Sequence, residues 1–233
     1  MSIRFAWPAG LFAVLLSAMP AWCELGPCRP GAHDMLVCGD GIGSAHVVAD
    51  TVSPDKKLAF AWRDPKGEPG VAPPYDHEFL LIRLADGAVL AKGVTDYFHT
   101  GQMRANRFEE IALWSPDSRF AVRVSDNRYG TQAFTLYAFG ADGALAAESD
   151  LRKIVEPALQ ARLKRGGRDP GSYSFSLAEQ DRSIGNGGKL GFHAVMAIPK
   201  KQPLVEYRVE MKIARVKTGV RAKVTRIRML AAQ

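Results

Sequence analysis

Residues 113–124 read Leu-Trp-Ser-Pro-Asp-Ser-Arg-Phe-Ala-Val-Arg-Val. Pro116 presets the backbone angle for a turn, and the side chains of Ser115 and Asp117 can hydrogen-bond to neighbouring amides. After the turn, every second residue from Phe120 to Val124 is large and apolar, which is the period of a strand with one buried face. The stretch therefore predicts two strands joined by a tight turn.

The same turn occurs sixty-two residues earlier, where residues 53–60 read Ser-Pro-Asp-Lys-Lys-Leu-Ala-Phe. Each copy is followed by an Asp-Gly pair between apolar runs, at Asp86-Gly87 and at Asp142-Gly143. Asp-Gly in this setting is the strongest short-range signal for a β-hairpin. Because the order of the parts repeats as well as the motif, the chain contains two similar units at about 45–95 and 105–147.

A third and weaker copy spans about 173–230, where Lys189-Leu190-Gly191-Phe192 repeats the strand that follows the turn. Between the second and third units, apolar residues at helical spacing predict a helix over 149–166, which Pro157 is expected to kink or divide. The predicted fold is all-β and mainly antiparallel, a single domain over 45–233 of three blade-like meanders with one inserted kinked helix.

The Trp-Ser-Pro-Asp-Ser-Arg-Phe-Ala-Val run, followed by a strand and an Asp-Gly turn, resembles the blade repeats of WD40-like and TolB-type β-propellers. In those blades a Ser-Pro-Asp turn joins two strands. The resemblance covers residues 45–147 well and 173–230 poorly. It implies a small or incomplete propeller or a β-sandwich, since closed propellers usually have four or more blades. It implies no catalytic residues, because the blade motifs are structural.

The N-terminus is typical of a secretory signal peptide, which we expect to span residues 1–21. Arg4 precedes an apolar run over 5–19 that is shorter than the ~20 residues needed to cross a bilayer, and no later segment is as apolar. We therefore expect a periplasmic or secreted protein without a transmembrane span. A lipid anchor on Cys23 is the less favoured alternative, because Trp22 stands where lipoprotein signals have a small residue.

All three cysteines lie in the N-terminal segment 22–44. In an exported chain, cysteines are most often paired. We favour a disulfide between Cys28 and Cys38, because Pro30-Gly31 lets the chain turn back between them; Cys23 with Cys38 is the alternative. The spacing of these cysteines and the nearby histidines matches no standard zinc pattern, so neither a metal nor another cofactor is expected.

The best candidate for catalysis is the cluster Asp76-His77-Glu78, a histidine between two carboxylates. The signal is weak, because no second histidine follows four residues later, and exposed polar residues entering a strand would look the same. No nucleophile elbow, phosphate-binding loop or Ser-x-x-Lys motif is present. His193, in an apolar strand, is expected to be a hydrogen-bonded core residue.

The formal net charge is +7, and the C-terminal region accounts for it: residues 200–228 contain ten Lys or Arg against two Glu. Between Tyr207 and Ile213 charged residues alternate with apolar ones, and the phase slips at Thr225-Arg226, which indicates a β-bulge. We interpret this hairpin as a docking face for an anionic envelope surface or an acidic protein. The predicted binding residues are Arg208, Lys212, Arg215, Lys217, Arg221, Lys223, Arg226 and Arg228.

Two alternatives stay open at this point. The cations can instead guard an edge hairpin against aggregation, and the loops at 64–74, 96–110 and 126–130 are a second candidate recognition surface. Nucleic acid is not an expected partner of an exported chain. The sequence therefore predicts a non-enzymatic binding or interaction module of a bacterial-type envelope. A hydrolase or metal-dependent enzyme using Asp76, His77 and Glu78 is the alternative.

Overall fold

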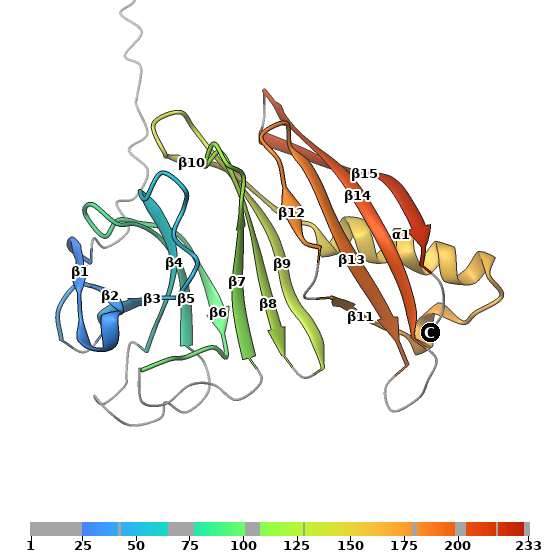
Figure 1. Cartoon of the computed structure of the whole chain (residues 1–233), viewed down its shortest axis with the longest axis horizontal. Helices are drawn as coiled ribbons and strands as arrows, with labels where there is room; N and C mark the ends of the chain where they lie inside the picture. The colour runs from blue at the N-terminus through green and yellow to red at the C-terminus, as the bar shows by residue number, and fades with distance from the viewer. Residues whose placement is uncertain are drawn as a thin grey trace, which may run out of the picture.

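The computed structural model describes residues 25–41, 43–64, 77–100, 108–127, 129–178, 181–198, 204–217 and 219–230. Over these ranges the chain forms three antiparallel β-sheets and one α-helix (Figure 1). The predicted class, mainly antiparallel all-β with one inserted helix, is confirmed. In the described part, no helix combines the length and the apolar character that crossing a bilayer requires. The predicted signal peptide and Cys23 lie outside the described residues.

The first sheet contains six strands in chain order: β1 (Cys28–Pro30), β2 (Leu36–Cys38), β3 (Ala45–Val47), β4 (Leu58–Arg63), β5 (His77–Arg83) and β6 (Val89–Thr95). A short 3-10 helix, η1 (Ala32–Asp34), connects β1 to β2. Cys28 and Cys38 are register partners in β1 and β2, and they form the predicted disulfide. The N–H of Cys28 also donates to the carbonyl of Leu84 just after β5, at 3.0 Å. The cysteine-containing segment is thus built into the first sheet.

The second sheet has the order β10-β9-β8-β7: β7 (Phe108–Trp114), β8 (Phe120–Asn127), β9 (Gly130–Phe139) and β10 (Leu145–Asp150). The third sheet has the order β11-β13-β14-β15, with β12 paired to β13: β11 (Ser174–Leu177), β12 (Ser183–Ile184), β13 (Lys189–Ala197), β14 (Val205–Val216) and β15 (Gly219–Met229). A one-turn 3-10 helix, η2 (Pro170–Ser172), precedes β11. The described sheets do not close into a barrel. The relationship to the propeller families stays a prediction.

The predicted helix is α1 (Arg152–Arg165), between the second and third sheets in the chain. The carboxylate of Asp150 accepts the amide of Arg152 at 3.0 Å, which satisfies one of the free N–H groups at the helix start. The helix continues through Pro157, so the proline does not divide it. One apolar stripe faces the core and is fully buried: Val155, Leu159 and Leu163.

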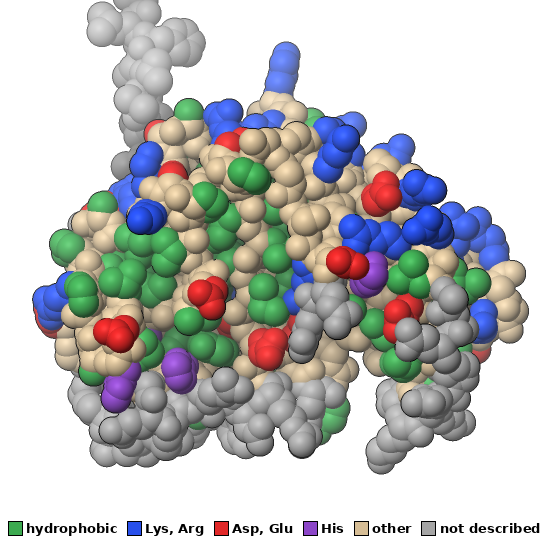
Figure 2. Space-filling model, in the orientation of Figure 1, with side chains coloured by type: hydrophobic (Ala, Val, Ile, Leu, Met, Phe, Trp, Pro, Cys, Tyr) green, Lys and Arg blue, Asp and Glu red, His purple; other side chains and the backbone are tan. Residues whose placement is uncertain are grey.

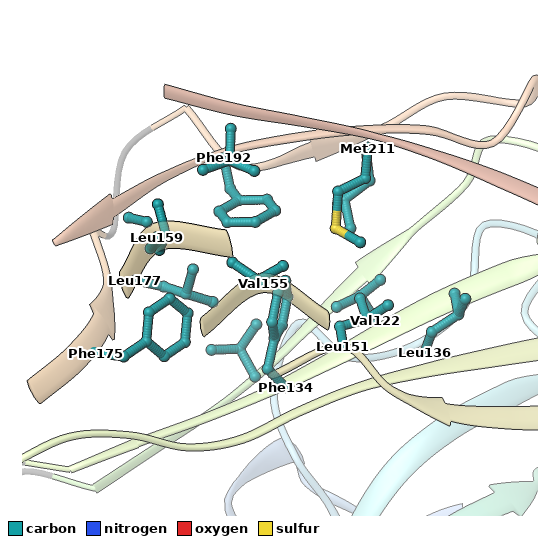
Figure 3. Packing of buried hydrophobic residues seen from close by; sticks show 14 of the residues in the cluster. Val122, Phe134, Leu136, Leu151, Val155, Leu159, Phe175, Leu177, Phe192 and Met211 are labelled. Carbon is teal, nitrogen blue, oxygen red and sulfur yellow. The ribbon is translucent and has the colours of Figure 1, made fainter. Parts of the chain in front are cut away.

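The three sheets are stacked, and apolar side chains fill both spaces between them. Between the first two sheets the rings of Phe60 and Tyr137 meet edge to face, with centroids 5.9 Å apart. Between the second sheet, α1 and the third sheet, Phe134 packs against Phe192 with ring centroids 5.1 Å apart (Figure 3). The inner face of the third sheet is therefore committed to the core, and only its other face is available to solvent or a partner.

The two Ser-Pro-Asp turns have the same hydrogen bonds. Ser53 Oγ donates to Asp55 Oδ1 at 2.7 Å, and Ser115 Oγ donates to Asp117 Oδ1 at 2.6 Å. The fourth residue of each turn has a positive φ, 58° at Lys56 and 55° at Ser118. The repetition seen in the sequence is therefore a repetition of local structure.

The turns are also connected from sheet to sheet. The amide of Asp55 donates to Ser118 Oγ at 3.1 Å, which joins the first turn to the second. The amide of Asp117 donates to Asn186 Oδ1 at 3.0 Å, which joins the second turn to the glycine-rich turn before β13. A row of three turns thus holds the ends of the three sheets in register.

Candidate functional site

The hairpin of β14 and β15 carries the predicted basic face. In β14, Tyr207, Val209, Met211 and Ile213 are buried, while the residues between them point away from the core. Cross-strand partners in a sheet lie on the same face. The partner of Arg208 is Arg228, and the partner of Lys212 is Lys223. These four cations therefore share the outer face of the third sheet.

A β-bulge keeps the cations of β15 on that face. Glu210 is opposite Arg226, whereas the next residue, Met211, is opposite Val224, so Thr225 is the extra residue in β15. Successive residues of a strand point to opposite faces. Arg221 and Lys223 precede the extra residue and Arg226 and Arg228 follow it, and only because of the bulge do all four point the same way. The predicted bulge is confirmed.

The neighbouring strand β13 adds one lysine and one histidine to the same face. Lys189 is the register partner of Lys212, and His193 is the partner of Arg208. His193 is therefore not a core residue, which corrects the expectation from the sequence; its Nε2 lies 3.4 Å from Asp181 Oδ2. Figure 2 shows Lys and Arg side chains gathered over the region where Figure 1 draws β13, β14 and β15. We call this surface the basic face; its cations are Lys189, Arg208, Lys212, Arg221, Lys223, Arg226 and Arg228.

Two of the predicted binding residues lie elsewhere. Arg215 is one of the alternate residues of β14 that point toward the core side of the sheet. Its guanidinium lies 5.6 Å from the centroid of the Phe120 ring and donates a hydrogen bond to the carbonyl of Arg119 at 3.5 Å. Lys217 is at the exposed turn between β14 and β15. Arg215 thus connects the hairpin to the second sheet, and the predicted set divides into six residues on the basic face and two outside it.

Like charges face each other directly on the basic face. Arg208 and Arg228 form one such pair, and Lys212 is flanked by Lys223 on one side and Lys189 on the other. Directly opposed like charges destabilise a sheet. Three carboxylates of the described residues lie on or beside this face: Glu206 and Glu210 point outward from β14, and Asp181 lies 4.0 Å from Arg208. Seven cations against three carboxylates give the face a net positive charge.

The alternative cluster is not brought together in the described residues. His77 is 2% exposed and packs against the rings of Trp62 and Phe98, each with its centroid 5.5 Å away. Glu78 points to the other side of β5 and pairs with Arg63, at 2.6 Å between Oε2 and Nε. Asp76 lies outside the described residues. The two described members therefore do not converge on one point.

His46 stacks on the other side of Trp62, with ring centroids 4.9 Å apart. Burial lowers the pKa of His46, which favours its neutral form. No group of three or more His, Cys, Asp or Glu side chains in the described part of the chain is arranged to hold a metal ion. The two histidines thus flank an aromatic cluster at one end of the first sheet.

One pocket of about 330 Å³ lies beside the row of turns. Its carboxylates are Asp55 and Asp117, and its cations are Lys57 and Arg119. Both carboxylates accept hydrogen bonds within their own turns, from a serine hydroxyl and from the backbone amides of Lys57 and Arg119. Burial by itself would raise the pKa of Asp55, but the hydrogen bonds from Ser53 and Lys57 outweigh it and lower the pKa. These carboxylates stabilise the turns.

Sequence reasoning missed two buried ion pairs, each at a junction between sheets. Where the first two sheets meet, the guanidinium of Arg123 donates to both carboxylate oxygens of Glu110, at 2.9 and 2.6 Å. Thr95 Oγ1 donates to the same carboxylate at 2.6 Å, and Arg123 lies 3.6 Å from the centroid of the Phe79 ring. Burial raises the pKa of nearby Tyr137.

The second pair joins the second and third sheets. Arg182 Nη2 donates to Asp126 Oδ2 at 3.1 Å, and Thr131 Oγ1 donates to Asp126 Oδ1 at 2.6 Å. Thr131 Oγ1 in turn accepts the amide of Leu177 at 2.9 Å, so β9 and β11 meet at the same place. Burial raises the pKa of Asp126 despite its hydrogen bonds from Thr131 and Arg182. Both pairs lie inside the stack, whereas the basic face lies on its surface.

Comparison with models of known protein families and with curated proteins finds no match to this chain.

Proposed function

We propose that this protein is an exported, non-enzymatic binding module that holds an anionic partner on the basic face. The observation that supports the proposal is the direct opposition of like charges, Arg208 with Arg228 and Lys212 with Lys223. Such pairs cost stability in the free protein. A bound anion removes that cost, because it places negative charge between the opposed cations.

Protection of an edge strand against aggregation explains only some of the cations on the basic face. Charges protect a sheet when they lie on its outermost strand. Arg208 and Lys212, however, belong to β14, which lies between β13 and β15, and Lys189 belongs to β13. Cations on three neighbouring strands form a surface about two strand spacings wide, or roughly 10 Å. A surface of that width supports contact with a multivalent anion.

The test compares the wild type with a variant in which Lys212, Arg221 and Lys223 are each changed to Gln. The probe is immobilised inorganic polyphosphate, with retention measured from 50 mM to 500 mM salt, which spans roughly a threefold change in screening length. We expect the wild type to be retained in a salt-dependent way and the variant to bind at least about tenfold more weakly, since a cation near an anionic surface contributes about 1 kcal/mol.

The matched control changes Lys56, Lys57 and Lys92 to Gln. These three lysines are exposed on the first sheet and its turn, and their loss changes the net charge by the same amount. We expect the control to bind like the wild type. Equal weakening of both variants would reduce the effect to net charge and contradict a specific face. Thermal unfolding adds a second readout: removing opposed cations from the basic face should leave the melting temperature unchanged or higher.

A further inference from the structure

Exposed apolar side chains accompany the cations of the hairpin. Five large apolar residues are strongly exposed within the described ranges, and three of them belong to the hairpin or its first flanking residue: Leu204 at 40%, Val216 at 38% and Met229 at 57%. Single exposed apolar residues are ordinary on protein surfaces. Their concentration on one hairpin that also carries the largest cluster of cations is what requires an explanation.

Leu204 and Met229 lie at the same end of the hairpin. Met229 is the register partner of Tyr207, and Leu204 precedes Tyr207 by three residues, which is about 10 Å along a strand. The strands remain paired to this end, because the amide of Leu230 donates to the carbonyl of Glu206 at 2.9 Å. The next pair on the basic face is Arg208 with Arg228. Met229, as the partner of Tyr207, points to the opposite face from Arg208 and Arg228, but it lies at the same end of the sheet as these two guanidinium groups.

The last turn of α1 brings further cations to this end. Burial raises the pKa of Tyr207, while the nearby guanidinium groups of Arg168 and Arg162 act in the opposite direction, which places them close to the start of β14. Arg162, Lys164 and Arg165 are all exposed. Figure 1 shows the end of β15 beside α1, and the two elements are in contact. The end of the hairpin that carries Leu204 and Met229 thus has Arg208 and Arg228 on one face and Arg162 and Arg168 near the other.

We infer that this end of the third sheet docks onto a bilayer of anionic phospholipid, with Leu204 and Met229 entering the headgroup region and the surrounding Arg and Lys contacting lipid phosphates. The inference rests on the proposed function and specifies its partner. Peripheral membrane contacts combine apolar side chains that reach the boundary of the acyl chains with basic residues that contact anionic headgroups. Charge alone would suit any polyanion, but a soluble polyanion offers no apolar layer for Leu204 and Met229.

The test is co-sedimentation with large unilamellar vesicles, either of equal parts phosphatidylglycerol and phosphatidylcholine or of phosphatidylcholine alone. We expect the wild type to bind only the anionic vesicles and to be released by salt. The variant Leu204→Gln with Met229→Gln should partition roughly tenfold less, since each side chain loses part of its apolar burial. The same variant should bind polyphosphate like the wild type, because its cations are intact.

The matched control changes Val94 and Tyr129 to Gln, the two other strongly exposed apolar residues, which lie in β6 and after β8. It should bind anionic vesicles like the wild type. Equal vesicle binding by the Leu204 and Met229 variant would overturn the insertion. Binding to polyphosphate or to an acidic protein, but not to vesicles, would overturn the lipid partner and leave the proposed function standing. Binding to none of these probes would overturn both.

Discussion

The hydroxyl of Thr225 donates a 3.0 Å hydrogen bond to the backbone carbonyl of Glu210, at the place where β15 has one residue more than β14. The extra residue reverses the alternation of β15. As a result Arg226 and Arg228 join Arg221 and Lys223 on the outer face, and Ile227 packs against the core. The bulge is therefore the backbone feature that assembles the basic face.

Deletion of Thr225 should leave Arg226 and Arg228 on the outer face and Ile227 toward the core, because removal of the extra residue joins Val224 directly to Arg226 in one unbroken alternation. We expect polyphosphate binding to be kept and the free energy of unfolding to fall by only about 1 kcal/mol, because the deletion removes the hydrogen bond from Thr225 to Glu210 but buries no charge. Thr225→Val is the control: it keeps the residue count and removes only the hydroxyl, which costs about 1 kcal/mol. Urea unfolding measures both. A deletion variant that is several kcal/mol less stable than Thr225→Val, or that no longer binds polyphosphate, would show that the deletion does not restore this pairing.

The pair of Arg123 and Glu110 should dominate the stability of the junction between the first two sheets. Glu110→Gln leaves the guanidinium of Arg123 buried without its counter-charge, and breaking a buried pair in this way costs about 3–5 kcal/mol. In the double variant Glu110→Leu with Arg123→Met no buried charge remains, so we expect it to regain at least half of that loss. Equilibrium urea unfolding of the two variants tests this. Additive losses would mean that the two side chains act independently.

The hydrogen bond from the amide of Asp55 to Ser118 Oγ should contribute measurably to the alignment of the sheets. Ser118→Ala removes the acceptor and keeps a Cβ at a positive φ of 55°, so we expect a loss of about 1–2 kcal/mol. Ser118→Gly removes the same acceptor but relieves the left-handed strain, and should lose less. Thermal unfolding distinguishes the two. A glycine variant less stable than the alanine variant would contradict this account.

The raised pKa of Asp126 predicts a pH dependence of stability. Because the pKa of this carboxyl is higher in the folded protein than in the unfolded chain, the folded state binds the proton first as the pH falls. Wild type should therefore gain stability relative to Asp126→Asn between neutral pH and about pH 4, and the difference should level off below the unfolded pKa of about 3.9. The groups that face this carboxyl are Arg182, Thr131 and, at longer range, Glu110.

Urea unfolding at several pH values measures the difference between wild type and Asp126→Asn. A difference that stays constant across this range would show that the carboxyl has the same pKa in both states. A difference that changes in the other direction would show that the ion pair with Arg182 outweighs burial.

Local features were predictable from the sequence because neighbouring residues determine them. The Ser-Pro-Asp turns depend on hydrogen bonds between residues no more than five positions apart. In β14, the alternation of apolar and charged residues predicts which side chains are buried. The bulge at Thr225 could be predicted because it leaves a visible slip in that alternation. The disulfide of Cys28 with Cys38 followed from a short connection with a turn inside it.

The alternation of apolar and polar residues along a strand indicates that the two faces of the strand differ, but it does not indicate what covers each face. His193 lies in an apolar strand, yet its side chain points to the outer face of the sheet. This orientation follows from its pairing with Arg208, which the sequence does not show. Arg215 was counted with the basic face, but its position in the inner phase of β14 brings it to Phe120. Both corrections come from contacts between strands that are distant in the sequence.

The sequence by itself determined the strands, the repeated turns, the inserted helix and the positive charge of the C-terminal hairpin, because each depends on spacing along one segment. Only the tertiary structure decided that cations from three strands form one face, that Arg162 and Arg168 lie near Tyr207, and that Glu110 and Asp126 pair with arginines inside the stack. The physical reason is that charge opposition and burial are set by strand register and sheet stacking, which bring together residues that no local pattern relates.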